Sequence, residues 1–253
     1  CVEGDVVVAA LSVLESGVPA RLHYGVADAK AWEVGLGCGG EIDVLVQPIG
    51  EDGYPPALMR HVLQETATGR SVTIGVDADD RMTTDPAKDA YTRTYAPPLT
   101  LILTGAVHIS QALAPLAKGL GYDVKIVDPR GSFAADERFS GMEVDDRWPD
   151  EALADWRPGP ATAVVALTHD PKLDDPALQA ALASDAFYIA ALGSRRSHAA
   201  RLERLQDAGA DEAALRRIHG PAGLPIGAAN PEEIALSIAA QMVAAWRGAL
   251  DKE

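Results

Sequence analysis

The chain of 253 residues carries 22 basic and 37 acidic residues, which gives a formal net charge of −15, and 47% of its residues are hydrophobic. This charge argues against nucleic acid or an anionic lipid surface as a partner, because both repel a strongly acidic protein. The longest apolar runs, such as residues 6–11, fall well short of the roughly 20 residues that a membrane helix needs, so we expect no membrane insertion. No signal-peptide pattern is visible.

The two cysteines, Cys1 and Cys38, stand alone rather than in a Cys-x-x-Cys pair. Isolated cysteines are not typical of a secreted disulfide scaffold, so we expect a reducing, cytoplasmic compartment. Because the chain starts at Cys1 instead of a methionine, we also expect further residues ahead of it.

The first section of the chain predicts a mixed α/β domain over residues 1–95. Its helices are expected at 3–16 and 55–66, and its strands at 22–26, 42–46 and 71–76. Between the first two strands lies a glycine-rich segment, residues 35–40. Pro97 and Pro98 then favour an extended backbone, which makes residues 95–98 the expected linker.

After the linker, short apolar strands alternate with amphipathic helices. Strands are expected at 99–103, 122–127, 163–167 and 187–192, and helices at 108–120, 176–183, 197–206 and 231–247. This alternation predicts a parallel sheet covered on both faces. Residues 99–253 are therefore expected to form a Rossmann-type domain, in which ligands bind beyond the carboxyl ends of the strands.

The turn after the first of these strands matches the dinucleotide fingerprint Gly-x-Gly-x-x-Gly only in part. Gly105 is present, but Val107 and Ser110 replace the other two glycines, and His108 follows. The helix that begins here still offers free N–H groups to an anion. A plain turn and a weakened phosphate site fit this segment equally well.

The next two turns carry charged side chains. Asp128 lies 23 residues after Gly105, near the spacing of an acid that binds a ribose, and Arg130 can meet a phosphate instead. His169 and Asp170 follow the third strand, where they can serve in hydrogen bonding or proton transfer. Ordinary turn chemistry for Asp128 and helix capping for Asp170 are the alternatives.

The turn after the fourth strand, Gly193-Ser194-Arg195-Arg196, is the strongest candidate for an anion site. A glycine turn, a hydroxyl and two guanidinium groups at the start of a helix all favour phosphate. Two solvated arginines are the alternative. The Gly- and Pro-rich residues 221–228 can close over the same edge or simply connect two elements.

In the first domain, Cys38 stands between glycines, beside Gly39. This placement predicts an accessible thiol, and the nearby amides can stabilise a thiolate, although a buried small cysteine is the commoner case. Cys1 stands at a helix start, where the helix dipole lowers a thiol pKa. A metal site formed by His108, His169 and His198 is disfavoured, because their spacing fits no compact ligand motif.

Seven segments together carry a pattern that extends over nearly the whole chain. They are residues 1–6, 35–40, 127–130, 167–174, 192–198, 223–228 and 231–235. In this order they resemble the XdhC/CoxI family, whose members have an N-terminal XdhC/CoxI domain and a C-terminal Rossmann domain. The family's first strand–helix turn is commonly Gly-Ala-Gly-His, and Val107 departs from it, which disfavours NAD(P) or FAD binding.

The resemblance implies an accessory protein that binds the molybdenum cofactor (molybdopterin), supports its sulfuration and delivers it to an apo molybdenum hydroxylase. A cysteine desulfurase and a second copy of the chain are further expected partners. On this basis Arg195, Arg196 and Asp128 are expected to hold the phosphate side of the pterin, with Cys38 and Cys1 near the molybdenum. The alternatives are an oxidoreductase that uses NAD(P) or a flavin, and a nucleotidyl or phosphoryl transferase that requires magnesium. The transferase lacks the Walker-type glycine–lysine loop.

Overall fold

A computed structural model describes residues 2–25, 41–77, 80–86, 91–131, 139, 142 and 144–250. The chain divides into two compact units. The first comprises residues 1–67 and 71–96, and the second comprises residues 68–70 and 97–253. None of the helices in the described ranges has the length and apolar character that a membrane crossing needs.

The first unit begins with a helix and an antiparallel pair of strands. Helix α1 (Val2–Ser16) precedes β1 (Ala20–Tyr24), which pairs with β2 (Ile42–Val46). Gly17 adopts a left-handed φ of +72° and donates its N–H to the Val13 carbonyl at 2.8 Å. This conformation ends α1, because a residue with a side chain rarely adopts it.

The same unit contains a three-stranded antiparallel sheet in the order β4-β3-β5. Its central strand β3 (Val72–Val76) lies between β4 (Met82–Thr83) and β5 (Thr92–Tyr95), and α3 (Pro56–Ala67) contacts β3. The buried core here consists of Val62, Val72, Ile74, Val76 and Met82.

The second unit is built on six parallel strands in the spatial order β11-β10-β9-β6-β7-β8. The strands are β6 (Leu99–Thr104), β7 (Tyr122–Val127), β8 (Val144–Asp145), β9 (Thr162–Ala166), β10 (Tyr188–Ala191) and β11 (Ile218–His219). Counted in chain order from β6 and read from β8, this is the order 3-2-1-4-5-6 of a doubly wound Rossmann sheet, which confirms the predicted fold. The order reverses between β6 and β9, and that is where such sheets open a crevice.

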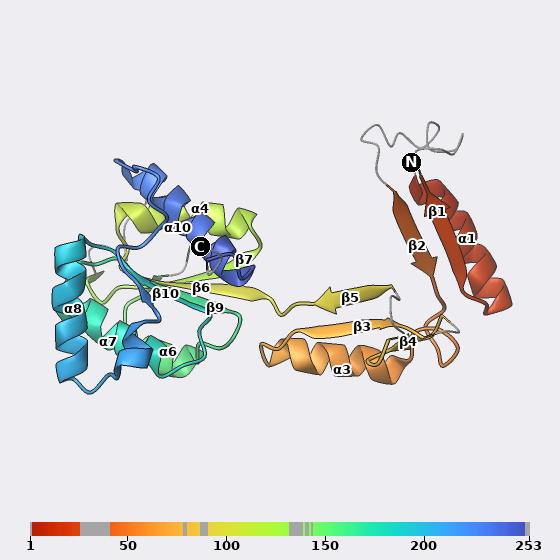
Figure 1. Ribbon diagram of the computed structural model, residues 1–253, viewed down its shortest axis with the longest axis horizontal. Helices are drawn as coiled ribbons and strands as arrows, with labels where there is room; N and C mark the ends of the chain where they lie inside the picture. The colour runs from red at the N-terminus through yellow and green to blue at the C-terminus, as the bar shows by residue number, and fades with distance from the viewer. Residues whose placement is uncertain are drawn as a thin grey trace. The chain divides into compact units, whose positions relative to one another are not determined.

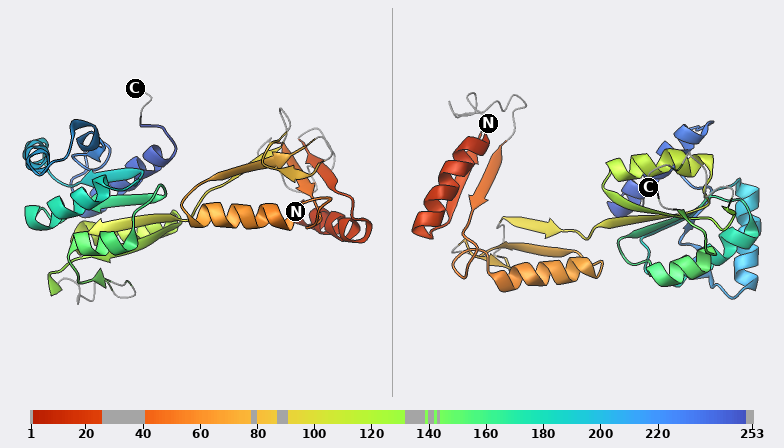
Figure 2. Two further views of the ribbon diagram at one scale, coloured as in Figure 1. Left: turned by 90° about the horizontal axis from the view of Figure 1, so that it is seen from below. Right: turned by 180° about the vertical axis from the view of Figure 1, so that it is seen from behind.

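Helices cover both faces of this sheet (Figures 1 and 2). Helices α4 (His108–Gly119) and α10 (Pro231–Trp246) pack together on one face, and α6 (Pro149–Trp156), α7 (Pro171–Leu182) and α8 (Arg195–Asp207) lie on the other. Side chains of β6 alternate between the two cores: Leu101 and Leu103 face α4 and α10, whereas Ile102 faces α6 and α7. A strand buried on both sides has to be apolar throughout, as its sequence shows.

The largest correction to a predicted boundary concerns the start of α7. The helix expected to start at residue 176 begins at Pro171, because the Asp170 carboxylate accepts a hydrogen bond from the Lys172 amide at 3.0 Å and caps the helix there. Proline is favoured at the first helical position, so Pro171 marks the start and Pro176 lies inside α7. The short elements β4, β5, β8, β11, α6 and α9 (Glu212–Leu215) were not predicted.

Candidate functional site

The turns that follow β6, β7, β9 and β10 meet at one edge of the parallel sheet. The Ala106 amide in the first turn donates to Asp128 Oδ2 in the second at 2.8 Å. A Cβ atom on Gly105 would lie 2.7 Å from the methyl group of Thr168 in the third turn. Gly105 also has a φ of +109°, so a glycine is needed there both for the conformation and for the space.

Asp128 supports the second turn from inside the protein. It is fully buried, and its two oxygens accept four hydrogen bonds, one from Ala106 and three from the amide and guanidinium of Arg130, at 2.7–3.0 Å. An ionised carboxylate has about four acceptor positions, so none is left for a ribose or a bound water. Burial alone would raise the pKa of Asp128, but the hydrogen bonds from Arg130 and Ala106 outweigh it and lower that pKa.

Arg130 is held in place by the same contacts. Its guanidinium donates to both oxygens of Asp128, while about a third of its side chain remains exposed. Its pKa is raised first by these hydrogen bonds and further by the charges of Asp128, Asp170 and Asp174. The guanidinium therefore lies within electrostatic range of the third turn.

In that third turn, His169 and Asp170 have different surroundings. Asp170 caps α7 through its side chain, as the simpler interpretation of the sequence expected. His169 is exposed, adopts a left-handed φ of +61° and lines a small cavity of about 150 Å³ together with Asp174, Ser197 and Arg201. A left-handed conformation is uncommon for a residue other than glycine, and such residues gather at functional sites.

The fourth turn presents the two arginines to solvent. Ser194 caps α8 by accepting a hydrogen bond from the Ser197 amide at 3.1 Å, and Arg195 and Arg196 occupy the first helical positions with exposed side chains. Gly193 has a φ of +144°, and a Cβ atom there would lie 2.5 Å from Ser197 Oγ. The backbone therefore comes closer to the start of α8 than any residue with a side chain allows.

A larger pocket of about 520 Å³ opens beside this turn, and we call it the crevice pocket. It is lined by Leu192, Gly193, Arg195, residues 221–228, Ile234 and Ser237. Arg195 is the charged side chain among these residues, and most of the other side chains are apolar, including Leu224, Ile226 and Ile234. Such a pocket suits a molecule that joins an anionic group to a flat apolar part.

The loop over the crevice pocket is fixed at its base. The Ala222 amide donates to the Ala191 carbonyl at 3.1 Å. Gln241 Oε1 accepts hydrogen bonds from both the Gly223 amide and the Tyr188 hydroxyl, at 2.8 and 2.6 Å. Ile226, near the tip, is 53% exposed. The predicted covering loop therefore has an anchored base and an apolar tip.

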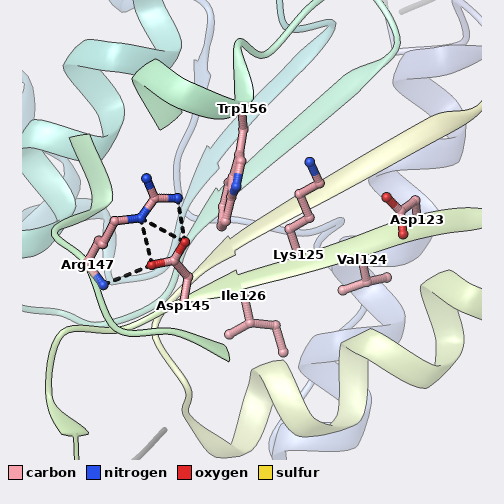
Figure 3. Close-up of a pocket in the computed structure, with 7 residues that line it drawn as sticks. All are labelled: Asp123, Val124, Lys125, Ile126, Asp145, Arg147 and Trp156. Atoms are coloured by element: carbon pink, nitrogen blue, oxygen red, sulfur yellow. Dashed lines mark hydrogen bonds and ion pairs between the residues drawn. The ribbon is translucent and has the colours of Figure 1, made fainter. Parts of the chain in front are cut away.

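A further pocket lies alongside β7 and beside the end of β8 (Figure 3). It measures about 390 Å³, and its charged groups largely satisfy one another. Arg147 donates to Asp145 at 2.7–3.0 Å, and Lys125 Nζ lies 5.2 Å from the centre of the Trp156 ring. Its cations are thus already engaged within the pocket.

The other predicted site residues fall outside this arrangement. Cys1, Cys38 and Gly39 lie outside the described residues. His108 is exposed at the first turn of α4, whose N-cap residue Val107 makes no side-chain capping bond. Among the described residues, no group of three or more His, Cys, Asp or Glu side chains could hold a metal ion, so the three histidines form no such site.

A buried charge pair, Asp174 and Arg201, was not predicted from the sequence; the two residues are 1% and 4% exposed. The sequence did contain a signal for this pair. Arg201 lies four residues before the fully buried Leu205 on the inward face of α8, where an unpaired cation is costly and a partner is therefore expected.

Comparison with known proteins places the chain among relatives of this architecture. The family model described as the XdhC Rossmann domain matches residues 101–242. A crystal structure described as a xanthine dehydrogenase from Bacillus halodurans superposes with a TM-score of 0.70 at 24% identity, covering 99% of this chain and 82% of that one. At this identity the likeness establishes the fold alone.

Curated proteins with similar sequences include a cofactor insertion chaperone and a dehydrogenase subunit. The molybdenum cofactor insertion chaperone PaoD of Escherichia coli (strain K12) is 27% identical over 253 residues, which is 96% of this chain and 71% of PaoD. A probable xanthine dehydrogenase subunit of Bacillus subtilis (strain 168) is 29% identical over 160 residues, 63% of this chain and 46% of that protein. The family model covers more than half of the chain, and the chain therefore belongs to the XdhC family.

Proposed function

We propose that this protein is a chaperone that binds the molybdenum cofactor as cargo and delivers it to an apo molybdenum hydroxylase. The names of the similar proteins, a molybdenum cofactor insertion chaperone and a probable xanthine dehydrogenase subunit, support this role. The observation that carries the proposal is the crevice pocket, where Arg195 stands at the start of α8 beside an apolar wall.

The pocket fits the chemistry of this cargo, which joins a phosphate to a flat pterin ring. Phosphate binds well where a guanidinium meets the first turn of a helix, because the amides there have no partner within the helix. Gly193 lets the backbone approach, and Arg196 adds positive charge at the same helix start. Leu224, Ile226 and Ile234 offer the ring an apolar surface.

The remaining turn residues support the proposed site by holding the turns in place. Asp128 and Arg130 hold the second turn against Ala106, and Ser194 and Asp170 fix the starts of α8 and α7. Gly105 brings the first turn against Thr168, and His169 and the exposed His108 border the same edge. The proposal therefore assigns the direct phosphate contact to Arg195 and Arg196 and a supporting role to Asp128.

The sulfuration step rests on the cysteines. Cys38, flanked by glycines, is the thiol that we propose near the molybdenum, with Gly39 supplying an amide and Cys1 as a second thiol. A thiolate is a soft ligand, and it can also attack the outer sulfur of a cysteine desulfurase persulfide, whose cysteine thiolate leaves, and so carry that sulfur as its own persulfide. We also propose that the chaperone acts as a homodimer.

An oxidoreductase that uses NAD(P) or a flavin remains the second candidate, because the strand order is that of dinucleotide-binding domains. However, the acid at the end of the second strand, Asp128, has its acceptor positions filled, and Val107 occupies the place of the glycine that approaches a pyrophosphate. These two features disfavour a bound dinucleotide.

The decisive experiment replaces the two arginines. The double variant Arg195→Ala/Arg196→Ala is expected to bind the molybdenum cofactor at least about tenfold more weakly, since each charge-assisted hydrogen bond contributes roughly 1.5–3 kcal/mol. Arg216→Ala is the matched control, because Arg216 forms an exposed ion pair with Glu212 in α9. Unchanged cofactor retention by the double variant would refute the assignment. Parallel titration of the wild-type protein with NAD(P) tests the second candidate.

The role of Cys38 calls for a separate measurement. Cys38→Ser is expected to stay folded but to activate the target hydroxylase less, because serine replaces the soft sulfur with a hard oxygen. Full activation by this variant would remove Cys38 from the mechanism.

A further inference from the structure

The charge pair formed by Asp174 in α7 and Arg201 in α8 is unusual in its burial and in its poor fit. Arg201 Nη2 lies 3.7 Å from Asp174 Oδ2, too far for a hydrogen bond. Asp174 Oδ2 and the Nε and Nη1 atoms of Arg201 have no hydrogen-bond partner among the described residues. A buried ion pair in this state is a poor source of stability, because desolvation of the two charges is not fully compensated.

Each member of the pair instead holds one of the turns at the carboxyl edge. Asp174 Oδ1 accepts hydrogen bonds from the amide and hydroxyl of Thr168, at 3.2 and 2.6 Å. The Thr168 methyl group is the one that packs against Gly105. The carboxylate thus fixes the third turn and, through Thr168, the first.

Arg201 acts in the same way on the fourth turn. Its Nη2 donates to the carbonyl of Leu192 at 2.9 Å, directly before Gly193. A Cβ atom on Gly193 would lie 3.9 Å from Arg201 Nη1. The guanidinium therefore lies against the backbone that precedes Arg195 and forms a hydrogen bond with it.

We propose that Asp174 and Arg201 are positioning residues, whose buried charge pair fixes the Leu192–Arg195 turn against the Thr168 turn so that the crevice pocket is preformed for an anion. The inference rests on the proposed function only for the identity of that anion. The pKa of Asp174 agrees with this placement: burial raises it, and the hydrogen bonds from Thr168 and the charge of Arg201 oppose the rise without cancelling it.

The test separates positioning from simple stabilisation. The double variant Asp174→Leu/Arg201→Met removes both charges together and fills their space with apolar groups, a change that often leaves stability unchanged or improved. If the pair serves positioning, the variant keeps its midpoint of thermal unfolding, yet backbone amides at 192–195 and 168–170 exchange with D₂O at least about tenfold faster in the ligand-free protein. Its affinity for the molybdenum cofactor also falls by about tenfold, the loss expected for one misplaced charge-assisted contact.

Two further variants complete the design. Arg204→Met, which removes the neighbouring and more exposed pair with Asp175, is expected to leave exchange at both turns as in the wild type. Arg201→Lys keeps the charge but loses the fork that reaches Leu192, so it is expected to increase exchange at 192–195 even if the double variant fails to fold. Wild-type exchange at 192–195 in Arg201→Lys, or wild-type exchange and affinity in a folded double variant, would overturn the inference. If the wild-type protein does not bind the cofactor, the proposed function fails, while the exchange data still decide the role of the pair.

Discussion

Two buried aspartates at the same edge of the sheet have their pKa values shifted in opposite directions. Asp128 is surrounded by donors, and its hydrogen bonds with Arg130 and Ala106 outweigh burial, so its pKa lies below its ordinary value. Asp174 has donors on one oxygen only, and burial dominates, so its pKa is raised. The charged form of aspartate is thus stabilised at position 128, whereas at position 174 it costs stability.

This difference predicts opposite pH dependences for two substitutions. Asp128 stabilises the folded protein above its unfolded pKa, near 3.8, and the contribution is lost as the pH falls through the lower folded value. The advantage of the wild type over Asp128→Asn is therefore expected to be full at pH 6 and to shrink below pH 4. Urea unfolding of both proteins between pH 3 and 7 measures the difference in their free energies of unfolding. A difference that stays constant over this pH range would contradict the prediction.

For Asp174 the sign is reversed. Its folded pKa is raised above 3.8, so the folded protein binds the proton more tightly than the unfolded chain, and ionisation costs stability as the pH rises through the folded value. Relative to Asp174→Asn, the wild type is expected to lose stability as the pH rises from 4 through the folded value. Urea unfolding over the same pH range measures how the stability of the wild type relative to Asp174→Asn changes with pH. If the wild type gained stability as the pH rises, Arg201 and Thr168 would already compensate the charge.

At the scale of the elements, the length of a helix or strand determined whether the sequence could predict it. Long strands and helices with clear periodicity, such as β6, β7 and α10, were predicted within about two residues. The two-residue strands β8 and β11 show no pattern of their own, because they are defined by pairing with β7 and β10. Their pairing depends on contacts distant in the sequence.

The same limit applies to the candidate site. The turns could be placed at one edge because parallel strands end together, and Arg195 lines the same pocket as residues 221–228. The inward direction of the Asp128 carboxylate could not be predicted, since it depends on the Ala106 amide and the Arg130 fork. The pairing of Asp174 with Arg201 depends likewise on how α7 packs against α8.

The packing of α8 against the loop over the crevice pocket yields a further prediction. A Cβ atom on Gly220 would lie 2.0 Å from His198 Nδ1, so the backbone passes directly against the imidazole. Gly220→Ala is expected to destabilise the protein by about 1–3 kcal/mol, as overpacking does. Adding His198→Ala removes the obstructing ring and is expected to restore a large part of that loss.

A double-mutant cycle by thermal unfolding measures this coupling. Gly159→Ala serves as the comparison for the glycine, because its added Cβ meets nothing within 4 Å and, like Gly220, it has no left-handed φ. Strictly additive effects of Gly220→Ala and His198→Ala would show that the contact is not the cause.

For the whole molecule, each of the three hydrophobic clusters of described residues lies within one of the two units. The two clusters on the faces of the six-stranded sheet draw every buried member from residues 101–242, and the third cluster draws its members from residues 62–82. No described core residue is shared between the units. Cores that share no residues are expected to fold independently, as separate domains do.

A fragment of residues 97–250 is therefore expected to fold by itself, because it holds all six strands and the helices on both faces. It should unfold in one cooperative transition, which calorimetry and circular dichroism report at the same temperature. It is expected to bind the cofactor in a manner that depends on Arg195, yet to fail in activating a target hydroxylase, because Cys38 belongs to the other unit. Full activation by the fragment would show that the cysteine-bearing unit is dispensable. A fragment that lacks a cooperative transition would show that the two units stabilise each other.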